Sequence, residues 1–223
     1  LAYSIGMLVQ LFISGMNSAL TPWMYSKIKK GDICSMRKVL QLLSVVVVGI
    51  AVALMLISPE LVLIFGSPKY REAVYVIPPV AASVFFIFIY NILSMPQFYY
   101  EKTQFLMAAS MAAAGANVVL NFIFIRLFGY IAAGYTTLAC YMLYSVGHYI
   151  VSKRILVNEE IQENLMSPGF LVACSVFLIG ASIICNLIFP YRILRYAILL
   201  ASAGLVFWKK ELLLKTMADI RKK

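Results

Sequence analysis

The sequence predicts an all-α integral membrane protein, built as a polytopic helical bundle of about seven transmembrane helices. Hydrophobic residues make up 63% of the 223 positions and charged residues 13%, whereas soluble globular domains contain roughly 45–50% and about 25%. Several apolar segments reach the length of about 20 residues that a helix needs to cross a bilayer. Basic residues are concentrated in alternate loops, as is typical of the cytoplasmic side of membrane proteins.

The first three predicted spans are separated by loops that contain charged residues. They cover residues 2–24, 39–64 and 74–98. Pro78, Pro79 and Pro96 fall inside the third span, where each proline removes a backbone donor and can bend the helix.

The last four predicted spans form two hairpins. They cover residues 104–125, 129–151, 169–189 and 191–208. The short stretch RLFG (126–129) joins the first pair, and Pro190 alone separates the second. A compact bundle follows, because irregular backbone in hydrocarbon would leave peptide groups without hydrogen bonds.

Charge predicts the orientation of these spans. Loops 25–38, 99–103, 152–168 and 209–223 contain 14 of the 19 Lys and Arg residues, which places these loops and the C-terminus in the cytoplasm and the N-terminus outside. The same distribution explains the net charge of +10, so no nucleic acid partner is expected. The basic tail 209–223 favours anionic membrane lipid. Because Leu1 already lies at the edge of an apolar run, we expect further spans before it.

The loops and motifs indicate little chemistry. The sequence contains no phosphate-loop, zinc-protease or nucleophile-elbow motif, and its single histidine has no ligand cluster. The four cysteines form no C-x-x-C pair, so neither a disulfide framework nor a zinc site is predicted. We expect no enzyme activity, no cofactor and no metal. Residues 152–168, with apolar Ile155, Ile161 and Leu165 opposite three glutamates, form either a short helix on the membrane surface or a solvated linker.

Polar side chains recur at helical spacing along four of the spans. They are Gln10, Ser14, Asn17 and Thr21 in the first; Tyr90, Ser94, Gln97 and Glu101 in the third, with Asn91 beside them; Ser110, Asn117 and Asn121 in the fourth; and Thr137, Tyr141, Tyr144 and His148 in the fifth. Polar groups at membrane depth normally face a bundle interior or a water-filled path. For any one residue, an interhelical hydrogen bond is the favoured interpretation. The four stripes together favour a hydrophilic path.

Two stretches carry a specific combination of motifs. In FYYEKTQF (98–105) an aromatic-rich helix end runs into EKT, and ANVVLNFIFIRLFGYIAAGYTTLACY (116–141) combines N-x-x-x-N with FG-x-x-AAG-x-TT. With NSALTPWMY (17–25) and SPELVLIFGSPKYREAVYVIPP (58–79), this combination resembles the polysaccharide-biosynthesis flippases of the multidrug/oligosaccharidyl-lipid/polysaccharide superfamily. The resemblance covers about the first 155 residues.

This resemblance implies an organisation for the chain. Residues 1–155 would form helices of the C-terminal lobe of a MATE-like flippase fold, 156–168 a cytoplasmic interfacial linker, and 169–223 the last two spans and the basic tail. The implied partners are a lipid-linked oligosaccharide substrate, membrane lipids, a missing N-terminal lobe of the same protein and a polysaccharide polymerase.

The implied function is transport. The intact protein would flip undecaprenyl-diphosphate-linked repeat units across the bacterial cytoplasmic membrane for capsule, exopolysaccharide or O-antigen synthesis. A drug exporter or a peptidoglycan-precursor (lipid II) flippase of the same superfamily shares the architecture. A membrane-embedded polysaccharide polymerase and a non-transporting scaffold are more distant alternatives.

The stripes and the resemblance together give the candidate site. The expected substrate-path residues are Gln10, Ser14, Asn17, Tyr90, Asn91, Ser94, Asn117, Asn121, Tyr141 and His148. By resemblance, Asn117 and Asn121 end one helix, Gly129 beside Arg126 permits the hairpin, and Gly134 begins the returning helix, where small residues allow close contact. No arginine or lysine lies in mid-span, so a cationic pyrophosphate site would lie at a helix end or in the missing lobe.

Overall fold

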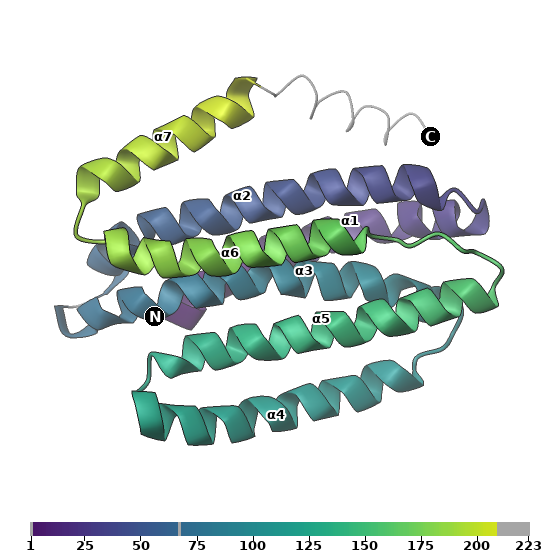
Figure 1. The fold of residues 1–223 in the computed structure, drawn as a ribbon, viewed down its shortest axis with the longest axis horizontal. Coiled ribbons are helices and arrows are strands. Elements are labelled where there is room, and N and C mark those ends of the chain that lie inside the picture. The colour runs from purple at the N-terminus through teal and green to yellow at the C-terminus, as the bar shows by residue number, and fades with distance from the viewer. Residues whose placement is uncertain (1, 67, 209–223) are drawn as a thin grey trace.

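The computed structural model describes residues 2–66 and 68–208, and within this part the chain is helical with short turns (Figure 1). The elements are α1 (Ala2–Lys29), α2 (Ile33–Phe65), the 3-10 segment η1 (Pro68–Val76), α3 (Ile77–Tyr99), α4 (Gln104–Phe128), α5 (Ala132–Asn158), α6 (Pro168–Ile188) and α7 (Arg192–Trp208). Each of the seven predicted spans is a helix. The basic tail 209–223 lies outside the described residues.

Five of these helices are long and apolar enough to cross a membrane. They are α1, α2, the continuous segment Arg71–Tyr99 that contains α3, α4 and α6. Helix α7 has only 17 residues, and α5 carries polar side chains along much of its length. The described chain is therefore a helical membrane bundle, as the composition predicts, and five of the seven predicted spans meet the requirement by length and composition.

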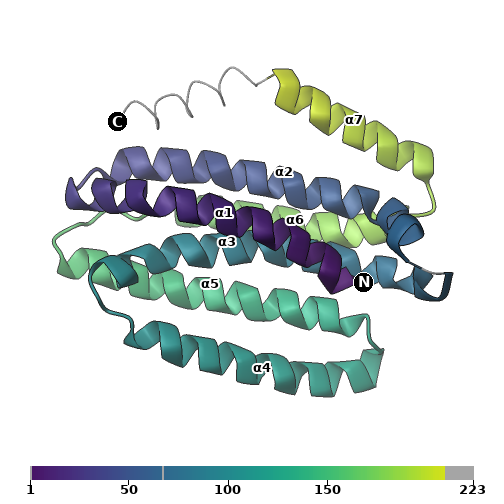
Figure 2. The same cartoon turned by 180° about the vertical axis from the view of Figure 1, so that it is seen from behind.

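Helix α3 lies at the centre of the bundle. Nearly all of its side chains are buried, and Phe85 and Phe88 are completely enclosed. Helices α1 and α6 pack on opposite sides of α3, and α2 and α5 flank it (Figures 1 and 2). At the two edges, α4 packs on α5 and α7 lies beside α2. Helix α4 has no buried residue, so its outer surface is free within the described chain.

The third span begins later than predicted. Residues 68–76 form η1, and α3 begins at Ile77, so Pro78 and Pro79 occupy its first turn. A first-turn residue needs no backbone donor inside the helix, and the fixed φ of proline suits that position. These two prolines therefore start an α-helix and do not interrupt one, and a bend of the span stays a prediction. Pro96 does lie inside α3.

Of the two interpretations of 152–168, the structure excludes the surface helix. Helix α5 continues to Asn158, and residues 159–167 contain no helix. This linker is held against the bundle: Leu165 and Met166 are buried, and the carboxylate of Glu163 accepts a hydrogen bond from the Arg37 guanidinium at 3.0 Å. The apolar residues that suggested a surface helix thus pack on the protein.

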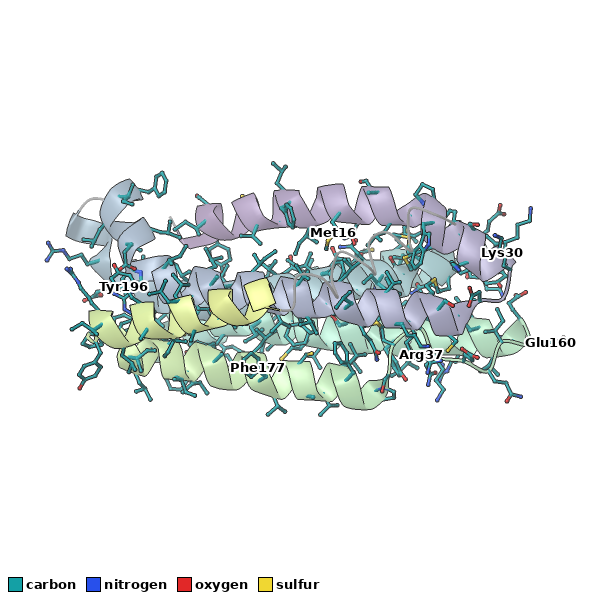
Figure 3. All side chains as sticks on the ribbon, turned by 90° about the horizontal axis from the view of Figure 1, so that it is seen from above. Met16, Lys30, Arg37, Glu160, Phe177 and Tyr196 are labelled. Atoms are coloured by element: carbon teal, nitrogen blue, oxygen red, sulfur yellow. The ribbon has the colours of Figure 1, made fainter. Side chains whose placement is uncertain are left out.

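The basic residues around the α1–α2 and α3–α4 turns lie at one end of the bundle. Figure 3 shows Lys30, Arg37 and Glu160 at this end and Tyr196 at the opposite end. Lys102 also lies here, and its ammonium donates to Glu159 at 2.8 Å. Of the loops predicted to be cytoplasmic, the three that the structure describes, 25–38, 99–103 and 152–168, therefore meet at the same end.

Two glutamates close helices at this end. Glu101 after α3 and Glu160 after α5 adopt left-handed φ values of 57° and 62°. The next amide reaches back in each case, from Lys102 to the Gln97 carbonyl and from Ile161 to the Leu156 carbonyl, both at 2.8 Å. This bonding is the Schellman pattern that usually carries glycine. The EKT turn is thus a helix stop followed at once by α4.

The turn between α1 and α2 is much shorter than the predicted loop 25–38. Gly31 has φ +68°, and Asp32 caps α2 by accepting a hydrogen bond from the Ser35 amide at 3.3 Å. The Lys27 ammonium donates to the other carboxylate oxygen at 2.5 Å. One aspartate therefore ends one helix and begins the next.

This aspartate makes the turn sensitive to acid. The hydrogen bonds from Lys27 and Ser35 lower the pKa of Asp32 to about 2, below the value of about 3.9 expected in an unfolded chain. Its stabilisation is therefore complete above pH ~4 and is lost as the pH falls towards ~2. Asp32→Asn keeps a capping side chain but loses the charge. We expect this variant to lose less stability than the wild type between pH 4 and pH 2, measured by denaturation in detergent; equal losses would contradict the assignment.

Candidate polar face

One side of α1 carries its polar stripe towards α5 and α3. At one end, the Tyr3 hydroxyl donates to the Ala133 carbonyl at 2.9 Å and lies 2.8 Å from the Thr137 hydroxyl, both on α5. At the other end, the Thr21 hydroxyl lies 3.7 Å from the Met95 sulfur on α3. Helix α1, which carries the stripe, therefore contacts α5 near its start and α3 further along. It lies on the side of the bundle that Figure 2 views.

Gln10 and Ser14 lie between these two contacts on the same helical stripe. Both side chains are exposed, whereas Asn17, the next residue of the stripe, is 8% exposed. The sequence predicts that Gln10, Ser14 and Asn17 share one polar stripe. The structure leaves the first two free to contact another molecule and packs the third against the bundle.

Tyrosine rings from α3 and α5 meet beside this stripe. Tyr90 and Tyr141 stack with ring centroids 6.2 Å apart, and Tyr90 lies 4.7 Å from Tyr144. The Tyr144 hydroxyl lies 2.7 Å from that of Ser110, which brings α4 into the same surface. Next to Tyr90, the partly exposed Asn91 donates to the Ile87 carbonyl at 2.7 Å. We call this surface the polar face; its residues are Gln10, Ser14, Tyr90, Asn91, Ser110, Tyr141 and Tyr144.

The two asparagines of α4 bind inside the α4–α5 hairpin. The Asn121 amide donates to the Asn117 side-chain oxygen at 2.9 Å, and the Thr136 hydroxyl donates to Asn121 at 2.5 Å. The pattern N-x-x-x-N thus links the two helices through a third polar residue. Ser94 on α3, unlike these two partly exposed asparagines, is buried, and it donates to the Asn91 carbonyl at 2.8 Å. A role for these three residues in the substrate path stays a prediction.

The hairpin has the glycine geometry that its sequence predicts. Gly129 has φ +77° and closes α4, where its amide bonds to the Ile125 carbonyl. Gly134 brings α5 close to the start of α3, because a Cβ there would lie 2.8 Å from Cγ of Pro79. Arg126 lies over the Phe122 ring, with 3.8 Å between guanidinium carbon and ring centroid. These three positions shape the turn.

Sequence reasoning missed a buried ion pair between α7 and α2. Arg195 lies near the start of the predicted span 191–208, and its side chain is 1% exposed and forms two hydrogen bonds of 2.8 Å with the Glu60 carboxylate. It also donates to the Leu56 carbonyl at 2.7 Å, and the Tyr196 hydroxyl donates to Glu60. The available signal was a glutamate near the end of one span and an arginine near the start of another at the same end of the bundle.

His148 lies inside the bundle and meets Gln97, the other pairing that the sequence did not foresee. Both side chains are fully buried, and 2.7 Å separates the amide nitrogen from Nδ1 of the imidazole. Each residue was assigned to a polar stripe of its own helix. The stripes could not show that the two side chains face one another.

Two cavities lie away from the polar face. One of 170 Å³ lies among α3, α5 and α6 and includes Phe85 and Leu171; one of 430 Å³ lies between α4 and α5 and includes Phe124 and Tyr135. Apolar side chains form most of both walls. No expected substrate-path residue lines either cavity. Within residues 2–66 and 68–208, no group of three His, Cys, Asp or Glu side chains could hold a metal ion.

Comparison of the chain with protein-family models, curated proteins and solved structures gives no match.

Proposed function

We propose that this chain belongs to a membrane transporter that flips lipid-linked oligosaccharides, and that the polar face is one wall of the substrate path. The observations that carry the proposal are the exposure of Gln10 and Ser14 on α1 and the group of tyrosines on α3 and α5, in a bundle of membrane-length helices. Hydrocarbon offers such groups no hydrogen bonds. A face of this kind needs water or a polar partner.

The chemistry of the face suits a sugar chain. The Gln10 amide both donates and accepts hydrogen bonds, and serine and tyrosine hydroxyls do the same. Tyrosine adds a flat apolar ring with a polar tip, which matches a sugar ring with apolar C–H faces and hydroxyl edges. The neighbouring α1 side chains Met7, Leu11 and Phe12 are exposed and apolar, so lipid can cover the rest of that helix.

The resemblance of EKT and FG-x-x-AAG-x-TT to the polysaccharide flippases supports this substrate class and a second lobe opposite the polar face. A drug exporter of the same superfamily would use a similar face. It differs in its cargo, so transport of a lipid-linked sugar and of a cationic drug, measured side by side, separates the two functions.

The decisive test removes hydrogen bonding from the polar face without adding charge. In the full-length protein, Gln10→Leu with Ser14→Ala should reduce surface polysaccharide by about thirtyfold, since two hydrogen bonds of ~1 kcal/mol each are lost. Membrane abundance should stay near normal because both side chains are exposed.

The matched control is Gln41→Leu with Ser175→Ala, which changes the same residue types on α2 and α6, away from the polar face. It should leave both polysaccharide and abundance unchanged. Equal transport by the two double variants, or a loss of transport fully explained by loss of protein, would contradict the proposed path.

The proposal includes an orientation in the bacterial cytoplasmic membrane, with the Lys30 and Arg37 end in the cytoplasm. Cys34 is exposed at this end, whereas Cys140 and Cys185 are buried. A membrane-impermeant thiol reagent should therefore label Cys34 only after the cells are opened, and Cys34→Ser should abolish that signal. Labelling of Cys34 in intact cells would reverse the orientation.

A further inference from the structure

A buried polar pair lies directly beneath the polar face. His148 on α5 and Gln97 on α3 are both 0% exposed and share the 2.7 Å contact between Nδ1 and the amide nitrogen. Because an amide N–H can only donate, Nδ1 accepts, and the imidazole proton is on Nε2. Two buried polar atoms then have no partner in the structure: Nε2 of His148 and Oε1 of Gln97.

Aromatic rings surround the imidazole. Ring centroids of Tyr144, Phe105 and Tyr90 lie 4.5, 5.4 and 5.9 Å from that of His148. Aromatic rings attract a cation placed within about 6 Å of their centroids. Three rings lie within this distance of the imidazole, and no carboxylate forms an ion pair with it among the described residues.

We propose that His148 is a proton-binding site. In the neutral state the Gln97 amide donates to Nδ1, as the structure shows. When a hydronium ion gives its proton to Nδ1 and leaves as water, that nitrogen becomes a donor. Rotation of the Gln97 amide by half a turn then places Oε1, which has no partner in the structure, where it accepts from Nδ1. The same two residues thus hold a hydrogen bond in both charge states, and release of the proton to water reverses the change.

The site is joined to the polar face and to the cytoplasmic end of α5. Tyr90 and Tyr144 contact His148 and are themselves part of the polar face. One turn further along α5, the hydroxyl of Ser152 is also buried and without a partner. A change in the charge of His148 can therefore alter the positions of Tyr90 and Tyr144 in the polar face. Ser152 extends the line of polar side chains along α5 towards the basic end of the bundle.

Neighbouring charged groups do not explain the hydrogen bond between Gln97 and His148. The titratable groups that face His148 are the phenols of Tyr90 on α3 and Tyr144 on α5, and α4 contributes the uncharged Phe105. Further along, Lys102 and Glu159 bond to one another, and Lys153 and Arg154 are exposed. The aromatic rings and the amide are therefore the groups that respond to the charge of His148.

The single histidine of the sequence allows a direct test. The full-length protein is labelled with ring-¹⁵N histidine and placed in nanodiscs of phosphatidylethanolamine and phosphatidylglycerol. If any preceding residues contain further histidines, these are replaced by glutamine. At pH ~8 the ring nitrogens should report one Nε2–H and one hydrogen-bonded acceptor at Nδ1. As the pH is lowered stepwise to ~4, both signals should shift reversibly to those of imidazolium. A ring that stays neutral throughout would overturn the proposal.

Two pairs of variants test the parts of the site. Gln97→Leu removes the acceptor for the charged state, and Tyr144→Leu removes a ring; each should move the titration to lower pH, whereas Gln97→Glu should move it to higher pH and Tyr144→Phe should leave it nearly unchanged. Titrations that are identical in all four folded variants would also overturn the proposal. Circular dichroism confirms that each variant has folded.

Coupling of this proton to transport rests on the proposed function. In vesicles, His148→Gln should lose accumulation driven by a proton gradient while retaining exchange of lipid-linked oligosaccharide without a gradient. Loss of both activities with normal folding would contradict the coupling. If the wild type moves no such substrate but the ring still titrates, the proton site stands and the proposed function fails.

Discussion

Glu60→Leu is expected to detach α7 from the bundle and to lower the free energy of unfolding by about 3 kcal/mol. The Arg195 guanidinium is 1% exposed, and without the carboxylate its one remaining hydrogen-bond partner among the described residues is the Leu56 carbonyl. An unpaired buried charge costs much more than a lost surface ion pair. Proteolysis of the 189–191 turn and denaturation in detergent should both show the change.

The control for this variant is Glu60→Leu combined with Arg195→Met. Removing both charges leaves an apolar contact of similar size, and such replacements are often neutral or stabilising. The double variant should therefore recover most of the lost stability and the protection of the turn. If it is as unstable as Glu60→Leu alone, the pair does not anchor α7 in the way its geometry indicates.

Gly134→Val is expected to have a comparable effect where the start of α5 packs against the start of α3. A Cβ at this position would lie 2.8 Å from Cγ of Pro79 and 3.1 Å from the backbone oxygen of Val76. The neighbouring ring and carbonyl are fixed by the start of α3, so α5 must move away from α3. Overpacking of this kind costs about 3 kcal/mol, and the variant should accumulate poorly and unfold at lower denaturant concentration.

A second glycine separates packing from the general cost of the substitution. At Gly180 on α6, a Cβ would meet no other atom within 4 Å, so Gly180→Val should change stability by no more than the difference in helix propensity. Equal losses at the two positions would show that the close approach of α5 to Pro79 does not matter. The α3–α5 contact is also the one that holds Gln97 against His148, so Gly134→Val should disturb the histidine signals as well.

The helices could be predicted from the sequence because their cause is local. An apolar run of about 20 residues satisfies its own backbone hydrogen bonds as a helix and matches the bilayer, so all seven segments were found without knowledge of their neighbours. The helix end at Gly129 could also be predicted, because its φ of +77° favours glycine. The helix ends at Glu101 and Glu160 could not be predicted in this way, because glutamate gives no signal for a left-handed conformation.

The sequence predicts which polar residues share one side of a helix, but it does not predict what that side contacts. Helical spacing shows that Gln10, Ser14 and Asn17 share one side of α1, but burial of Asn17 and exposure of Gln10 depend on where α3 lies. The same limit applied to 152–168, whose apolar residues pack on the bundle and not on a membrane surface. Amphipathic spacing gives a direction around a helix and does not identify what lies in that direction.

The amino-acid sequence alone thus specifies a bundle of apolar helices, with basic turns at one end and a glycine hairpin between α4 and α5. The packing of the helices adds that Asn121 meets Thr136, that Gln97 meets His148 and that Glu60 meets Arg195. The difference arises because hydrophobicity and backbone conformation act along the chain, whereas each of these hydrogen bonds joins side chains from two helices. Such a bond exists only once the helices have packed in one register.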